Sequence, residues 1–349
     1  MKPLISVIIP AYNAHSTIAA TIASVQRQSC SDLEIIVVDD GSSDATPDIV
    51  RGLQGQDSRL GLIRQENGGV SRARNAGIAV ARGRYVALLD GDDIWHPQKL
   101  ERQVARFDAA PGGVGLVYCW YRRIDADDRV YPNSPAARVE GRVYHRHLEW
   151  NFVSNGSTPM VPTDLARAVG FETALHDATG QGCEDYLFQL RVARTHRFAC
   201  VPAYLTGYRR VDGSLSRDIE GMIRWHLKMY DLILADGGGH GPAGGIVARR
   251  QAQLLVELAR NRLRRGHLAE AAGHLLRALR YAPASVPPFV AMELRAAWRR
   301  LTPAPLPLAP GRDFLSYGIE EPDGTWAPSR SAAYLARLER WDGAMETAG

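Results

Sequence analysis

The chain has 349 residues, of which 45% are hydrophobic and 23% are charged, as is ordinary for a folded globular protein. Its formal net charge of only +4 gives no indication of nucleic-acid binding. The apolar run at residues 4–9 is too short for a signal peptide or a membrane span, and the four cysteines match no zinc or redox spacing. We therefore expect a cytoplasmic protein with free thiols.

Strand and helix patterns alternate through the first 120 residues. Short apolar runs predict strands at 4–9, 34–39, 60–63, 84–89 and 114–119. Helical patterns fill 16–29, 45–53, 71–82 and 97–109. The alternation predicts an α/β domain with a mostly parallel sheet and helices on both faces. The next hundred residues are less periodic and rich in turns, as expected of a binding half built on the first.

The last third of the chain is predicted to be helical. From about residue 217 the pattern has a helical period, and a glycine-rich break at 237–245 precedes a predicted helical hairpin at 246–281. Gly266 would form the turn of this hairpin. Residues 301–349 contain several prolines and show no strong period, so they are expected to form a tail.

Residues 246–300 are strongly basic. They contain eleven arginines against three glutamates, a net charge of +8. Such a surface can contact an anionic membrane, at about 1 kcal/mol for each basic residue near the lipid. A solvated helix face with arginines at helix ends explains the charge equally well. Both interpretations stay open from the sequence.

Two acidic clusters follow predicted strands. Asp39-Asp40-Gly41-Ser42-Ser43-Asp44 comes after the apolar run 35–38, and Asp90-Gly91-Asp92-Asp93 comes after the run 85–89. In open α/β sheets, ligands bind outside the carboxyl ends of the strands. Mg²⁺-type ions take one or two carboxylates together with phosphate oxygens of a substrate. The sequence therefore predicts a site for Mg²⁺ or Mn²⁺ and a phosphate-bearing ligand.

Five segments, in this order, resemble family 2 of the glycosyltransferases: Pro10-Ala11-Tyr12-Asn13, the first acidic cluster, the stretch from Asn67 to Asn75, the second acidic cluster, and Glu184-Asp185. The resemblance covers roughly residues 4–215. It implies a Rossmann-like GT-A domain at 1–216, with a nucleotide-sugar half at 1–120 and an acceptor half at 121–216. The helical region at 217–300 would be an extension of that domain.

The resemblance assigns donor-binding roles to residues of the first half. The turn of Pro10, Ala11, Tyr12 and Asn13 would hold the nucleobase, with the Tyr12 ring stacked on it. Asp40 would accept a hydrogen bond from the base, which favours uridine. Alone, the turn could equally be a strand end with a packed tyrosine.

Asp39 would support this loop, and Asp44 would cap a helix. The glycine turn that contains Asn67 and Gly68 enters a helix, where backbone N–H groups suit phosphate and ribose contacts. Arg74 would point at the nucleotide.

The second acidic cluster resembles the D-x-D element of the family. The resemblance places Asp90 and Gly91 at the ribose and Asp92 on the metal, with Asp93 in support. Like charges this close raise one another's pKa unless a cation is present, which favours a metal over a solvated acidic turn.

The resemblance makes Asp185 the general base of an inverting enzyme, with Glu184 beside it. The alternative is a pair of acidic residues favoured in the first turn of a helix.

The remaining assignments concern the acceptor and the leaving group. Arg209, in a loop that often closes over the diphosphate in similar proteins, is expected to support the site. Four residues of the second half are candidate acceptor contacts, although each type is more often found in a core or on a surface: Trp120, Trp150, Asn155 and His176. Processive relatives carry Gln-x-x-Arg-Trp, and this chain has Gly221 in place of the Gln before Arg224 and Trp225. We therefore expect transfer of a single sugar.

The resemblance implies a nucleotide-diphosphate sugar donor, with UDP favoured, and a saccharide or lipid-linked saccharide acceptor. Two other functions are compatible with the α/β pattern. A sugar nucleotidyltransferase is expected to carry a glycine-rich, basic loop after the first strand, and residues 10–15 contain neither Gly nor Lys. A non-catalytic interaction protein acting through the helical tail would be favoured by loss of the acidic clusters, and both are intact.

Overall fold

The computed structural model describes residues 2–110, 112–132, 134–177, 180–210, 218–285, 313–316 and 332–347. The chain divides into two compact units. The first comprises residues 1–147, 151–213 and 309–349, and the second comprises residues 148–150 and 214–308. The domain boundaries expected at residues 216 and 300 remain predictions.

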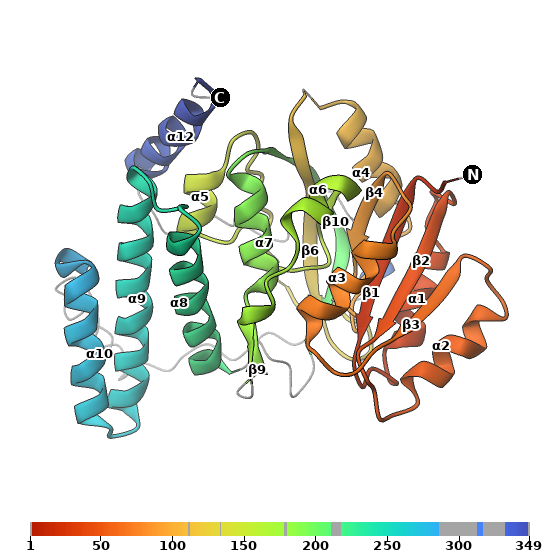
Figure 1. Cartoon of the computed structure of the whole chain (residues 1–349), viewed down its shortest axis with the longest axis horizontal. Coiled ribbons are helices and arrows are strands. Elements are labelled where there is room, and N and C mark those ends of the chain that lie inside the picture. The colour runs from red at the N-terminus through yellow and green to blue at the C-terminus, as the bar shows by residue number, and fades with distance from the viewer. Residues whose placement is uncertain are drawn as a thin grey trace. The chain divides into compact units, whose positions relative to one another are not determined.

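The first unit is built on a mostly parallel sheet, as predicted (Figure 1). Its eight strands lie in the order β3-β2-β1-β4-β7-β6-β10-β5. Parallel pairing joins β1 to β2 and β4, β2 to β3, and β6 to β10, whereas β7 and β5 run antiparallel to their neighbours. The strands are β1 (Ile5–Ala11), β2 (Leu33–Asp39), β3 (Leu60–Arg64), β4 (Tyr85–Leu88), β5 (Ile94–Trp95), β6 (Val114–Ile124), β7 (Met160–Pro162) and β10 (Arg197–Arg209).

Helices cover both faces of this sheet, and the alternation of residues along β1 explains why. Val7 and Ile9 belong to the core cluster that contains Ile22 of α1. Ile8 points to the opposite face, where a Cβ on Gly77 of α3 would lie 2.5 Å from its Cγ2. Because both faces are buried, β1 is a continuous apolar run. The helices up to residue 210 are α1 (Ile18–Gln26), α2 (Thr46–Gln54), α3 (Val70–Val80), α4 (Lys99–Asp108), α5 (Tyr144–Glu149), α6 (Thr163–Val169) and α7 (Glu184–Ala193).

Every element predicted between residues 4 and 120 is present, with ends shifted by a few residues, and β5 is an addition. The less periodic half contains the long strand β10, the short strand β7 and a separate hairpin of β8 (His176–Asp177) and β9 (Gly180–Gln181). Arg209, which was expected in a loop at 208–216, is the last residue of β10, and residues 211–216 of that expected loop lie outside the described residues.

The chain after residue 308 returns to the first unit. Phe314 is 1% exposed and packs with Ile94, Ile124 and Val130. The helix α12 (Ala332–Thr347) places Asp342 in the interior, where its carboxylate accepts hydrogen bonds from the N–H of His145 at 2.7 Å and from Nε of Arg146 at 2.7 Å. The part of the predicted tail that the structure describes is therefore packed against the α/β unit.

The second unit consists of α8 (Ile219–Ala235), α9 (Pro242–Arg264) and α10 (Leu268–Tyr281), with α9 in contact with both other helices (Figure 1). α9 and α10 form a hairpin, and Gly266 in its turn has a φ of +82°, a conformation that favours glycine. Among the helices that the structure describes, none combines the length and apolar character needed to cross a membrane.

Candidate active site

The ends of β1 and β2 form a single platform. The N–H of Asp40 donates to the carbonyl of Ala11 at 2.8 Å. Asn13 has a φ of +49° and is held on both sides, since its N–H donates to Oγ of Ser42 at 2.9 Å and its Oδ1 accepts from the N–H of Ser43 at 2.9 Å. Tyr12, between these anchors, is 55% exposed. A fixed backbone thus presents an open aromatic ring at the edge of the sheet.

Asp40 connects this platform to the glycine turn before α3. Its carboxylate is buried and accepts hydrogen bonds from the N–H of Gly68 at 3.0 Å, from the N–H of Gly69 at 2.8 Å and from Nε2 of Gln65 at 2.7 Å. Gly69 has a φ of +85°. Asp40 therefore fixes the turn that carries Asn67, and any contact with a base would add to these bonds.

Two neighbours of Asp40 differ in exposure. Asp39 is fully buried, and its carboxylate accepts from Nε of Arg64 at 2.8 Å and from the N–H of Ser42 at 3.3 Å. Arg72 is exposed and lies over Gly68, and it makes no ion pair within the described residues. Asp39 thus supports the loop, while Arg72 presents a positive charge beside the glycine turn.

The second acidic cluster is anchored by its backbone and by Asp93. Hydroxyl groups of Thr17 and Thr21 donate to the carbonyl of Gly91 at 2.8 and 3.1 Å. Asp93 is fully buried and accepts from Oγ of Ser157 at 2.6 Å. The same Ser157 oxygen accepts from the N–H of Asp90 at 3.0 Å. Asp93 and Ser157 therefore fix the backbone on which Asp90 and Asp92 are placed.

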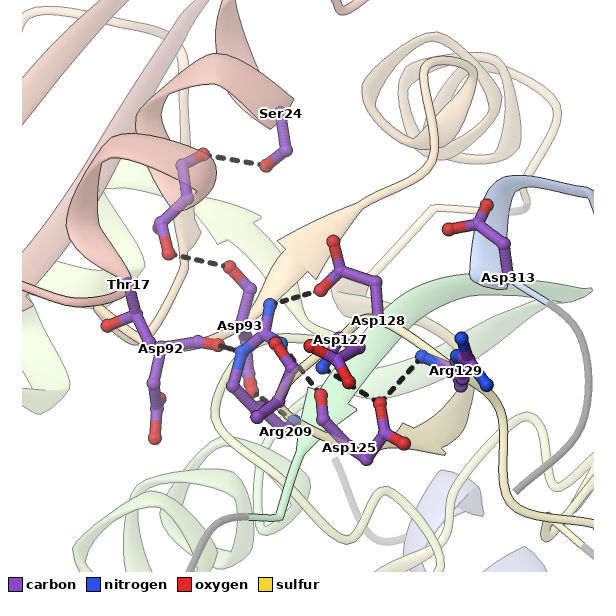
Figure 2. Close-up of polar contacts among 12 residues, drawn as sticks. Thr17, Ser24, Asp92, Asp93, Asp125, Asp127, Asp128, Arg129, Arg209 and Asp313 are labelled. Atoms are coloured by element: carbon purple, nitrogen blue, oxygen red, sulfur yellow. Dashed lines mark hydrogen bonds and ion pairs between the residues drawn. The ribbon is translucent and has the colours of Figure 1, made fainter.

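Arg209 is buried and binds this cluster through both its backbone and its side chain (Figure 2). Its Nε donates to the carbonyl of Asp92 at 2.7 Å, and its N–H donates to the carboxylate of Asp93 at 2.9 Å. The rest of the guanidinium binds the carbonyl of Asp125 at 2.7 Å and pairs with the carboxylate of Asp128. With its donors used in this way, Arg209 positions the acidic cluster.

The carboxylate of Asp92 suits a divalent cation. It is half-buried, and no described side chain donates a hydrogen bond to it (Figure 2). Burial and the nearby charge of Asp90 raise the pKa of Asp92 to about 6. A cation would relieve this cost of ionisation, and a carboxylate oxygen is a ligand that Mg²⁺ and Mn²⁺ accept. The described residues contain no group of three or more His, Cys, Asp or Glu side chains arranged to hold a metal.

Arg74 joins the two ends of the site. Its side chain is 2% exposed, with Nη2 at 2.6 Å from the carboxylate of Asp90 and Nη1 at 2.7 Å from the carboxylate of Glu184. Burial alone would lower the pKa of Arg74, but the charges of Asp90 and Glu184 raise it above its ordinary value. The contact of Arg74 with a nucleotide stays a prediction, and in the structure its guanidinium is buried and paired with two carboxylates.

Asp185 follows at the start of α7, after Cys183, whose φ of +63° turns the chain into the helix. Its Oδ1 accepts from the N–H of Tyr186 at 2.7 Å. Burial, followed by the charge of Glu184, raises the pKa of Asp185 to about 7, against the opposing charge of Arg74. A carboxylate with a pKa near neutrality is well matched to accept a proton from a hydroxyl group.

The four candidate acceptor residues lie in different environments. Trp120 is 8% exposed, and its Nε1 donates to the carbonyl of Ala137 at 3.0 Å, which is the packing of a core residue. Asn155 is buried, and its Nδ2 has no hydrogen-bond partner within the described residues. His176 is half-buried against the glycine turn, where a Cβ on Gly69 would lie 2.9 Å from its Cγ. Trp150 belongs to the second unit.

Some residues of the site gave no signal in the sequence. Ser157 connects Asp90 with Asp93 from more than sixty residues away. Oε1 of Gln181 accepts from the N–H of Val70 at 2.9 Å, at the first residue of α3. Each is an ordinary residue type in a stretch without periodicity, so only the folded structure identifies its role.

The sheet order and the acidic clusters at the strand ends define a GT-A type fold. Two solved structures share it at identities that establish the fold alone. TarS 1–349 of Staphylococcus aureus in complex with UDP-GlcNAc gives a TM-score of 0.59 at 20% identity over 84% of this chain and 84% of TarS 1–349. The mannosyltransferase PcManGT of Pyrobaculum calidifontis in complex with GDP-Man and Mn²⁺ gives 0.56 at 21% identity over 86% of this chain and 81% of PcManGT.

Sequence comparison identifies the family. The model of glycosyl transferase family 2 matches residues 6–164. The glycosyltransferase GlyG of Streptococcus pneumoniae is 30% identical over 233 residues, which cover 62% of this chain and 74% of GlyG. The chain belongs to glycosyltransferase family 2.

A second relative has a more detailed name. WfgD of Escherichia coli, a UDP-Glc:α-D-GlcNAc-diphosphoundecaprenol β-1,3-glucosyltransferase, is 46% identical over 103 residues, which cover 29% of this chain and 40% of WfgD. The chain spans about 40% of the length of the first curated relatives that it matches.

Proposed function

We propose that this protein transfers a single sugar from a nucleoside-diphosphate sugar to an acceptor hydroxyl group, with inversion at the anomeric carbon. The observation that carries the proposal is the buried pairing of Arg74 with both Asp90 and Glu184. This pairing brings the acidic cluster at the end of β4 together with the first turn of α7, which contains Asp185. The side chain of Arg74 therefore connects the proposed donor site to the turn of α7 that contains the candidate base.

The donor site begins at the platform of β1 and β2. The exposed ring of Tyr12 is placed to stack on a base, and Asp40 favours uridine because a carboxylate can accept from the N–H of uracil. The glycine turn that follows Asn67 presents backbone N–H groups at the start of α3, and Arg72 adds a positive charge there. Asp90 and Gly91 are assigned to the ribose side.

The metal ligand in this proposal is Asp92, supported by Asp93 and Arg209. Its raised pKa, and the absence of a described side chain that donates a hydrogen bond to it, favour Mn²⁺ or Mg²⁺ at this carboxylate. When bound, such an ion would stabilise the negative charge that develops on the leaving diphosphate. PcManGT was solved with GDP-Man and Mn²⁺, which supports the choice of ion.

The chemical step is a single displacement. The oxygen of the acceptor hydroxyl group forms the new bond to the anomeric carbon as the bond from that carbon to the diphosphate oxygen breaks, and the electron pair leaves with the diphosphate. Asp185, whose carboxylate accepts a hydrogen bond from the N–H of Tyr186, takes the proton of the hydroxyl group, and the charges of Glu184 and Arg74 act on its pKa in opposite directions. Its pKa of about 7 supports this role because an ionised fraction is available at neutral pH.

The acceptor is proposed to be a growing saccharide, free or linked to a lipid, in the synthesis of a cell-surface polysaccharide or glycolipid. WfgD is named for transfer to GlcNAc on diphosphoundecaprenol, which supports a lipid-linked substrate. Nδ2 of Asn155, which has no hydrogen-bond partner within the described residues, and the ring of His176 are polar groups that could contact a saccharide. A lipid-linked acceptor would be met at the inner face of a membrane.

The first experiment is a calorimetric titration of UDP, GDP, dTDP and CDP, each with and without Mn²⁺. We expect one diphosphate, UDP, to bind in a metal-dependent manner. Asp185→Asn should bind the same diphosphate and lose transfer by about 10²- to 10⁴-fold in kcat. Asp164→Asn, which alters an exposed aspartate on α6, is the matched control and should transfer at the parent rate. Parent-rate transfer by Asp185→Asn would remove the base assignment.

A further inference from the structure

The helical unit contains a basic cavity that the proposed transfer reaction does not use. The cavity has a volume of about 320 Å³ and lies where α8 and α10 flank α9. Its polar lining comes from all three helices: Arg224, Lys228 and Asp231 of α8, Arg262 of α9, and His274 and Arg277 of α10. Four cationic side chains thus face one carboxylate in a space large enough for a phosphate-bearing headgroup.

Only part of this positive charge is balanced within the unit. Arg262 pairs with Glu220 at 2.8 Å and with Glu270 at 3.2 Å. Arg224 is exposed and reaches Asp218 only at 3.9 Å. Arg277 makes no ion pair with any described residue. The excess of positive charge in the cavity is therefore carried by Arg224 of α8 and Arg277 of α10.

Asp231 and His274 complete the polar groups of the cavity. Oδ1 of Asp231 already accepts from Nε2 of Gln251 at 2.7 Å. Nδ1 of His274 is buried and has no hydrogen-bond partner within the described residues. An imidazole that is free to donate, beside unbalanced guanidinium groups, is suited to oxygen atoms that carry negative charge.

Apolar side chains on the same hairpin are exposed to an unusual degree. Leu268 is 69% exposed and Leu276 is 63% exposed, and Leu263 and Leu279 are also exposed. Helices that lie in a membrane interface combine basic residues with exposed leucines in this way. The apolar side chains favour a lipid as the source of the negative charge over a free phosphate ion.

We propose that this cavity binds the phosphate group of an anionic phospholipid, so that the helical unit docks on a membrane surface. Arg224 of α8 and Arg277 of α10 would bind the phosphate oxygens, His274 would donate a hydrogen bond from Nδ1, and the exposed leucines of α9 and α10 would enter the acyl boundary. The site is independent of sugar transfer, because none of its residues belongs to the donor site or to the base.

The test measures binding of the full chain to vesicles by co-sedimentation. One set of vesicles is phosphatidylcholine alone, and the other contains equal amounts of phosphatidylcholine and phosphatidylglycerol. We expect binding only to the second set, and we expect Arg277→Gln to weaken it about tenfold. Arg280→Gln is the matched control, because Arg280 is an exposed arginine on the same helix that does not line the cavity. It should weaken binding clearly less than Arg277→Gln does, by no more than the roughly fivefold that about 1 kcal/mol of surface charge contributes.

Three results would overturn the proposal. Equal losses in Arg277→Gln and Arg280→Gln would mean that diffuse surface charge binds the vesicles. Absence of binding by the parent protein would exclude a lipid ligand. Binding of inorganic phosphate or pyrophosphate, followed through the ring resonances of His274, without any binding to vesicles would assign the cavity to a soluble ligand. The same variants are also titrated with UDP. Their UDP affinity should equal that of the parent, so that a loss of vesicle binding is not caused by a change at the donor site.

Discussion

Arg74 is the side chain whose replacement should have the largest effect on both stability and chemistry. The substitution Arg74→Met removes the positive charge and leaves the carboxylates of Asp90 and Glu184, at 2.6 and 2.7 Å from its nitrogens, without their partner. Removing one member of a buried ion pair costs about 3–5 kcal/mol, because the remaining charge stays buried and unbalanced. Urea unfolding should therefore show that the free energy of unfolding of Arg74→Met is lower than that of the parent by about 3–5 kcal/mol.

The same substitution should change the protonation of Asp185. The charge of Arg74 lowers the pKa of Asp185, whereas those of Glu184 and Asp90 raise it. In Arg74→Met the lowering contribution is lost and both raising contributions remain, so the pKa moves up from about 7. A rise of one unit would reduce the ionised fraction at pH 7 from about one half to about one tenth. The acid limb of the pH profile of kcat/KM should move to higher pH, with activity recovered above pH 8.

Two further variants separate charge from geometry. Arg74→Lys keeps the charge, but one ammonium group cannot reach both carboxylates. This variant should therefore be less stable than the parent, and the acid limb of its pH profile should move less than that of Arg74→Met. Arg51→Met removes an exposed arginine that pairs with Asp48 on the surface, and it should cost less than about 1 kcal/mol and leave the pH profile unchanged. An Arg74→Met enzyme that transfers sugar with its acid limb in the parent position would refute the reasoning.

Three other predictions concern the donor site. Asp92→Asn should abolish the increase in nucleotide affinity that Mn²⁺ gives to the parent, measured by calorimetry, and an unchanged Mn²⁺ effect would contradict the ligand assignment. Tyr12→Ala should weaken UDP binding by about 1–3 kcal/mol through lost stacking while leaving the melting temperature unchanged, because the ring is 55% exposed, and Tyr12→Phe should bind as the parent does. Phe314→Ala should destabilise the protein by about 3 kcal/mol and also weaken metal-dependent UDP binding, because the lost ring packs with Ile94, which directly follows Asp93 of the acidic cluster. If calorimetry showed that Phe314→Ala binds UDP with the affinity of the parent, Phe314 would have a role in stability alone.

The sequence predicted the first half of the α/β unit because burial on both faces leaves a direct pattern. Strands such as β1 and β2 are continuous apolar runs, and the polar residues that end them stand out. The sequence alone therefore predicts that the acidic clusters lie at one edge of the sheet. The mostly parallel sheet is confirmed, and so is the family to which these clusters pointed.

The pairings inside the site could not be read from the sequence, because they join distant segments. Arg74 was expected to face the nucleotide because it is a cation near a glycine turn, yet its partners lie 16 and 110 residues away. Phe314 and Asp342 lie in a stretch without periodicity, and each is nevertheless 1% exposed in the first unit. A pattern within a window of residues reports the local period, and it contains no information about which distant carboxylate neutralises a given cation.

The helix α3 contacts both the proposed donor region and the segment that contains the proposed base. Val70, at its first residue, donates its N–H to Gln181, and Arg74, four residues later, pairs with Glu184. The N-terminal part of α3 therefore binds the segment that leads into Asp185 at two points, once through a backbone N–H and once through a side chain. The same helix begins at the glycine turn that Asp40 fixes. A donor held at this turn and an acceptor hydroxyl group beside Asp185 would therefore be aligned through a single rigid element, as a displacement at one carbon atom requires.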